Sequence, residues 1–172
     1  MTDNEKISLE EIKKIPAELL QSLINKAKRK LKNDETMQNI FKEYGVDVNI
    51  IDFIPTAFSD LEVSAKTDHG IVYLNYKLLC DGDFNKDYSY LIHEYTHWAQ
   101  QCLRDKPTQS ADDGEYLDNP HEKEGFQNQI EYIANEFGED EAEKYVDDLL
   151  NHHEVNDKKE KTERKDELMS KV

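Results

Sequence analysis

The stretch His93-Glu94-Tyr95-Thr96-His97 places two imidazoles one helical turn apart, with a carboxylate between them. Histidines at positions i and i+4 of a helix share one face, where both can bind a single Zn²⁺ ion. A glutamate directly after the first histidine is typical of a general base that takes a proton from a metal-activated water. We therefore predict a zinc site with His93 and His97 as ligands and Glu94 as the catalytic base.

The residues around this stretch predict a helix from position 87 to about 103. At about 100° per residue, the two histidines lie only about 40° apart and almost opposite the apolar face of that helix. A histidine that belongs to the core would lie on the apolar face, so we expect this pair to face solvent or a cleft. The apolar face consists of Tyr88, Leu91, Ile92, Tyr95, Ala99, Cys102 and Leu103.

The segment before the motif predicts helices and then strands. Residues 1–45 have helical spacing, with a capping box at Ser8 and Glu11. From residue 46 the period changes to two, which predicts three short strands, within 46–54, 61–65 and 71–74. We therefore expect an α+β fold, in which a small antiparallel or mixed sheet packs on the motif helix and extra helices precede it.

The segment after the motif predicts a loop at 104–119 and then a second important helix. Asn119 is a favoured N-cap residue, and Pro120 suits the first helical position. We expect a single domain over 1–153, made of a helical part at 1–45, strands at 46–80 and active-site helices at 87–138. The charged segment 154–172 has few apolar residues and is expected to be a disordered tail or a frayed helix.

A third zinc ligand has to come from outside the motif, because catalytic zinc takes three protein ligands and leaves one position for water. The candidates are His121, Glu122 and Glu124, all in the first turns after Pro120. Glu124 projects about 160° from the apolar face, as the histidines do on their own helix. We favour Glu124 as the third ligand and keep Glu122 as the alternative, since helical phase alone does not separate them.

Two supporting roles also have candidates. An oxyanion donor is needed in amide hydrolysis, and Tyr116 in the loop is the first choice, with Tyr132 behind it. Asn128 lies one turn beyond Glu124 and could hold a ligand histidine by its second ring nitrogen.

The composition points to a protein of the cytoplasm. The chain has 172 residues and a net charge of −16, and residues 81–153 hold 19 acidic against 5 basic side chains. Such a charge repels phosphate backbones and acidic membranes, so we expect no nucleic-acid or membrane partner. No apolar run reaches the about 20 residues of a membrane span, no signal peptide is expected, and the two cysteines, Cys80 and Cys102, form no CxxC pair.

The residues of 93–100 and 116–125 together resemble the small gluzincin-type zinc metallopeptidases, or minigluzincins, found among bacterial and phage proteins. In that family a HExxHxxQ helix is followed by a Pro-x-Glu-x-Glu-Ala helix that brings the third ligand. Here the pattern is met by His93 to Gln100 and by Pro120 to Glu124, with Gly125 where alanine is usual. The resemblance covers about residues 61–138.

The resemblance implies a zincin-like fold, one Zn²⁺ per chain and Glu124 as the third ligand. It also implies that the strand at 71–74 is an edge strand, on which a peptide or protein substrate binds in extended form. The expected activity is hydrolysis of peptide bonds in the cytoplasm, or in the host cytoplasm if the protein is phage-encoded. Two alternatives stay open: a non-catalytic interaction protein that retains the fold, and a zinc hydrolase of non-peptide amides. The intact Glu94 favours an enzyme.

Overall fold

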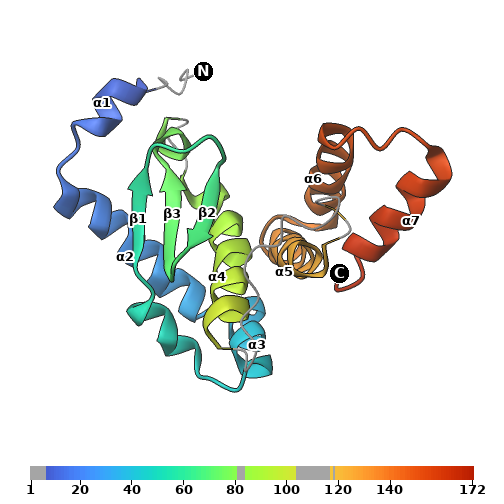
Figure 1. Cartoon of the computed structure of the whole chain (residues 1–172), viewed down its shortest axis with the longest axis horizontal. Coiled ribbons are helices and arrows are strands. Elements are labelled where there is room, and N and C mark those ends of the chain that lie inside the picture. The colour runs from blue at the N-terminus through green and yellow to red at the C-terminus, as the bar shows by residue number, and fades with distance from the viewer. Residues whose placement is uncertain (1–6, 81–83, 104–116, 118) are drawn as a thin grey trace. The chain divides into compact units, whose positions relative to one another are not determined.

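The computed structural model describes residues 7–80, 84–103, 117 and 119–172. The chain divides into two compact units, residues 1–108 and 109–172, where the sequence predicts one domain over 1–153. Figure 1 shows the helices of both units and the small sheet of the first unit. The predicted α+β class is confirmed, because helices dominate and the described strands form one three-stranded mixed sheet.

The first unit begins with helices, two of which are capped by side chains at their starts. Ser8 Oγ accepts a hydrogen bond from the Glu11 amide, as the capping box predicts, and Asp34 caps the third helix by accepting from the Met37 amide. The elements in chain order are α1 (Leu9–Lys13), α2 (Ala17–Lys32), α3 (Glu35–Glu43), the 3₁₀ helix η1 (Val48–Phe53), β1 (Thr56–Ser59), β2 (Ala65–Asp68), β3 (Ile71–Asn75), η2 (Tyr76–Leu79), η3 (Phe84–Asp87) and α4 (Tyr88–Cys102).

The sheet differs from the prediction: β1 (Thr56–Ser59) was not predicted, and the strand expected at 61–65 lies at 65–68 instead. Residues 46–54 do not form a strand: the Asp47 side chain accepts from the Asn49 amide at 2.8 Å and starts η1 instead. The sheet order is β1-β3-β2, with β1 parallel and β2 antiparallel to β3. The prediction that 71–74 is an edge strand is therefore wrong, because β3 is the central strand. Strand β2 is an edge, and it packs beside α4 (Figure 1).

A buried polar network joins α2, β1 and α4. The Ile54 carbonyl accepts hydrogen bonds from Lys28 Nζ at 2.7 Å and from Thr56 Oγ1 at 3.1 Å. Because the Thr56 proton is used in this way, the Tyr95 hydroxyl is the donor in its 2.9 Å bond to Thr56 Oγ1. Burial raises the pKa of Tyr95 and lowers the pKa of Lys28. The negative charge of Asp52 opposes the shift at Lys28. The network fixes α4 against the start of the sheet.

The second unit contains α5 (Pro120–Phe137), α6 (Glu139–His152) and α7 (Lys158–Leu168). Helix α5 starts as predicted, with the Asn119 side chain accepting from the His121 amide at 2.9 Å and Pro120 in the first turn. It ends at Gly138, whose φ of 103° is readily adopted only by glycine. The core of this unit consists of Leu117, Phe126, Ile130, Ile133, Ala142, Val146, Leu150, Val155 and Leu168.

The charged segment 154–172 is ordered into α7 instead of forming the expected disordered or frayed tail. Leu168 is buried in the core of the second unit. Lys165 pairs with Asp147 of α6 at 3.2 Å, and Lys123 of α5 pairs with Glu167 at 2.6 Å. Helix α7 has few apolar residues and is therefore held by the buried Leu168 and by ion pairs along its sides. In the part of the chain that the structure describes, no helix is long and apolar enough to cross a membrane.

The Tyr95 hydroxyl offers a test of the buried network. Tyr95→Phe removes the bond to Thr56 and should lower the free energy of unfolding by about 1–2 kcal/mol, because a buried acceptor loses its donor. Urea denaturation followed by circular dichroism measures the change. The matched control is Tyr73→Phe on β3, a half-buried tyrosine, which should change stability by no more than about 0.5 kcal/mol. Equal losses in both variants would contradict a role for the network.

Candidate metal centre

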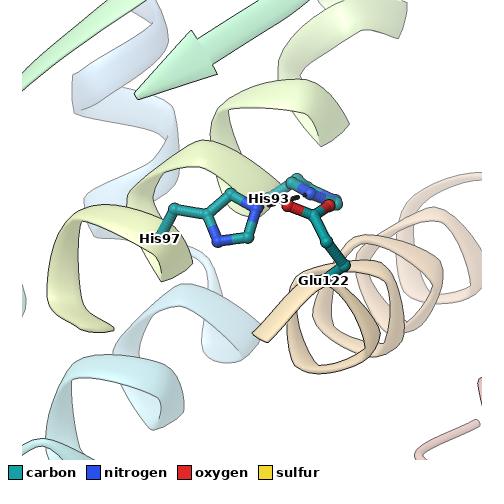
Figure 2. Close-up of side chains that lie close together, drawn as sticks. All are labelled: His93, His97 and Glu122. Atoms are coloured by element: carbon teal, nitrogen blue, oxygen red, sulfur yellow. Dashed lines mark hydrogen bonds between the residues drawn. The ribbon is translucent and has the colours of Figure 1, made fainter. Parts of the chain in front are cut away.

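The two motif histidines lie on α4 with their ring nitrogens facing each other. His93 Nε2 and His97 Nε2 are 3.0 Å apart, and the ring planes are at 73° to each other (Figure 2). Two nitrogens that bind one tetrahedral zinc at 2.0–2.1 Å are about 3.3 Å apart. The side chains are 5% and 9% exposed, so they are more buried than the sequence predicts. The separation of the pair is close to, and slightly shorter than, the one that a shared zinc ion needs.

The orientation of His97 is set by Gln100 on the next turn of α4. His97 Nδ1 lies 2.8 Å from Gln100 Oε1, and Gln100 is 1% exposed. An amide oxygen only accepts hydrogen bonds, so His97 Nδ1 carries the proton and donates it. His97 Nε2 is therefore left with a lone pair, which is the tautomer that a metal ligand requires.

The same assignment determines the direction of the bond between the histidines. Because His97 Nε2 has no proton, His93 Nε2 is the donor in the 3.0 Å contact. A cation bound at both Nε2 atoms would take the place of that proton, and neutral His93 would then carry its proton on Nδ1. Metal binding at this pair would therefore exchange a hydrogen bond for two coordinate bonds and change the tautomer of His93.

Glu94 follows His93 on α4, and its side chain is held by the edge strand β2. Its side chain is 7% exposed, and its Oε2 accepts a 2.7 Å hydrogen bond from Thr67 Oγ1. One turn further along α4, Trp98 Nε1 donates to the Gly70 carbonyl in the β2–β3 turn at 3.2 Å. Helix α4 is thus attached to the hairpin at two points, and one of them is the carboxylate that the sequence assigns as the general base.

The candidates for a third ligand are in the first turns of α5. His121, Glu122 and Glu124 are all half-buried. Glu122 interacts electrostatically with His153. The pKa of His153 is lowered, first by burial and then by His152, and the negative charge of Glu122 opposes this shift. Within its own unit, Glu122 therefore belongs to a polar cluster at one end of α5, so it is not simply a solvated acid.

Three further candidates have different outcomes. Tyr116, the first choice for an oxyanion donor, lies outside the described residues. Tyr132 is 0% exposed on α5, and this burial is typical of a packing residue. Asn128 Oδ1 accepts a hydrogen bond from Lys171 Nζ at 2.5 Å, so its carbonyl oxygen holds the C-terminal segment. The role of orienting a ligand histidine, expected for Asn128, is filled for His97 by Gln100.

Gln100, which is part of the HExxHxxQ pattern, and Thr67 were not predicted to have a role in the site, for different reasons. Gln100 has a local signal, because residues three apart on a helix face the same way. Thr67 has none: it lies 27 positions before Glu94, in a strand where threonine is an ordinary residue. Only the packing of β2 on α4 brings its hydroxyl to Glu94.

The two donors on α4 fit a zinc ion in type, since neutral imidazole nitrogens are preferred zinc ligands. Comparisons with protein-family models, with curated proteins and with solved structures give no significant match.

Replacing Gln100 tests its effect on the histidine pair. Gln100→Leu removes the acceptor for His97 Nδ1–H and should weaken zinc binding by about 10–100-fold, as loss of an outer-shell partner does. Competition with a chromogenic chelator measures the dissociation constant. The control Gln101→Leu changes the neighbouring, half-buried glutamine and should leave the affinity within about twofold of the wild type. Unchanged affinity in Gln100→Leu would contradict the tautomer assignment.

Proposed function

We propose that this protein is a zinc-dependent metallopeptidase of the gluzincin type. The observation that carries the proposal is the arrangement on α4: two imidazole nitrogens 3.0 Å apart, one of them oriented by Gln100, and next to His93 in the chain the Glu94 carboxylate, which is held by Thr67. A site that only stabilises a fold needs ligands and has no use for an adjacent carboxylate that binds no metal. Histidine ligands with a carboxylate base instead match the requirements of metal-assisted hydrolysis.

In the proposed site, a glutamate at the start of α5 is the third ligand, and we propose Glu122 for this part. Glu124, which the sequence favours, is the other candidate, and a pair of matched variants decides between them. One carboxylate and two neutral imidazoles leave a net positive charge on the site, which suits activation of a water.

Each residue has a defined part in the proposed reaction. When bound, the zinc ion lowers the pKa of a water and polarises the carbonyl of the substrate. Glu94 takes a proton from the attacking water and passes it to the nitrogen of the leaving amine, so that the C–N bond breaks as a new C–O bond forms. His93 and His97 stay neutral ligands throughout. The Gln100 acceptor keeps the His97 ring in place.

The proposed substrate is a peptide in extended form. Among the residues that the structure describes, strand β2 pairs with β3 on one side only, so its other edge offers backbone groups to an added strand. This edge replaces the one expected at 71–74. Because Thr67 of β2 is bonded to Glu94, a peptide added along β2 would lie close to the catalytic base.

Replacing the general base separates binding from catalysis. Wild type and Glu94→Gln should each contain one zinc per chain by inductively coupled plasma mass spectrometry. Hydrolysis of a mixed library of quenched fluorescent peptides should fall by about 10²–10⁴-fold in Glu94→Gln, the range for loss of a general base. Glu18→Gln, an exposed position on α2, serves as the control and should keep full activity. Equal activity in Glu94→Gln and wild type would remove Glu94 from the mechanism, and a wild type without zinc would remove the site.

The third ligand is identified by a pair of matched variants. Glu122→Ala should weaken zinc binding by more than the roughly 10–100-fold that loss of an outer-shell group costs. Glu124→Ala should bind zinc within about threefold of the wild type, because Glu124 is outside the proposed donor set. Titration with a chelator gives both dissociation constants. If Glu124→Ala weakened zinc binding more than Glu122→Ala, the third ligand would be Glu124, as the sequence pattern predicts.

A further inference from the structure

We infer that Thr67 is a positioning residue, which holds the carboxylate of Glu94 in the orientation needed for proton transfer. The inference rests on the proposed function for its chemical meaning. Its structural basis lies entirely within the first unit, in the contact between β2 and α4. Thr67 is absent from the sequence motif, and nothing in the family resemblance assigns it a role.

The contact is short and part-buried. Thr67 Oγ1 lies 2.7 Å from Glu94 Oε2, and Glu94 is only 7% exposed. At 2.7 Å the bond has the length typical of a hydroxyl that donates to an oxygen acceptor. A long glutamate side chain that lies in one orientation gives up rotamer freedom, which has an entropic cost. The Thr67 bond offsets part of this cost before a substrate arrives.

The Thr67 hydroxyl has a second acceptor on the same residue. Its Oγ1 is also 2.9 Å from the backbone carbonyl oxygen of Glu94. A hydroxyl has one proton to donate, so the two acceptors share it. The second acceptor belongs to the α4 backbone and does not move with the carboxylate. The hydroxyl is therefore bonded to the α4 backbone as well as to the carboxylate, and the backbone bond keeps it in position to hold the carboxylate.

The strand that carries Thr67 is itself firmly placed. Thr67 is paired with Val72 of β3, whose side chain is 0% exposed in the core. The alternation along β2 directs Ala65 and Thr67 to the half-buried face, while Lys66 and Asp68 are exposed. Trp98 fastens the adjacent turn through Gly70. Because both partners are on rigid elements, the distance between hydroxyl and carboxylate is set by packing.

A pair of substitutions separates the hydroxyl from the shape of the side chain. Thr67→Val keeps the branched shape and the strand preference but has no hydroxyl, whereas Thr67→Ser keeps the hydroxyl and loses a methyl group. Steady-state kinetics on the best peptide from the library, zinc analysis and urea denaturation are measured for both zinc-loaded variants. Crystal structures of both at high resolution give the position of the Glu94 carboxylate.

For a positioning role we expect kcat to fall about 10–100-fold in Thr67→Val, because displacement of a catalytic group by about 1 Å has an effect of this size. KM should stay within about twofold, and zinc should stay at one per chain. Thr67→Ser should recover kcat to within about threefold of the wild type. The Glu94 carboxylate should move in the valine variant and keep its place in the serine variant.

Several results would overturn the inference. An active wild type with an equally active Thr67→Val variant would show that the hydroxyl does nothing, and so would a serine variant as slow as the valine variant. If the wild type hydrolyses no peptide, the proposed function fails, and the crystal structures still decide the positioning role. In that case an unmoved carboxylate in Thr67→Val overturns it, whereas a displaced carboxylate supports it.

Discussion

The first unit depends on the burial of α4 together with its polar side chains. His93, Glu94, His97 and Gln100 are all under 10% exposed, and a buried polar group without a hydrogen-bond partner is costly. Each therefore needs a partner at a fixed distance. The partners come from α4 itself for the histidines and from the edge strand β2 for the carboxylate. This requirement for partners determines how the hairpin packs on the helix.

The requirement links stability to chemistry. The Tyr95–Thr56–Ile54 network places α4 at the start of the sheet, and the Thr67 and Trp98 bonds place it along the hairpin. These contacts prevent the helix from rotating without losing buried hydrogen bonds. In a preorganised site of this kind, part of the folding free energy holds the functional groups in place before a cation and a water bind. The proposed metallopeptidase activity would rest on that rigidity.

Much of the candidate site could be predicted from residues that are close together in the sequence. The spacing of His93 and His97 specifies one helix face, and the Asn119-Pro120 start specifies where α5 begins, because both depend on residues within one or two turns. The strand predicted at 46–54 failed because the Asp47 side chain bonds to a nearby amide, a local choice that competes with strand formation. Order in the segment 154–172 was missed because it comes from Leu168 and from ion pairs with distant residues.

The amino-acid pattern alone was enough to establish the helix of residues 88–102, its pair of facing histidines and the carboxylate between them, since helical geometry repeats every 3.6 residues. Tertiary structure decided which strand is central, that β2 lies beside α4, and that Thr67 bonds to Glu94. These contacts join residues far apart in the chain, and they arise only when buried polar groups and apolar side chains are satisfied together. The local periodicity of the sequence does not indicate which distant residues will contact each other.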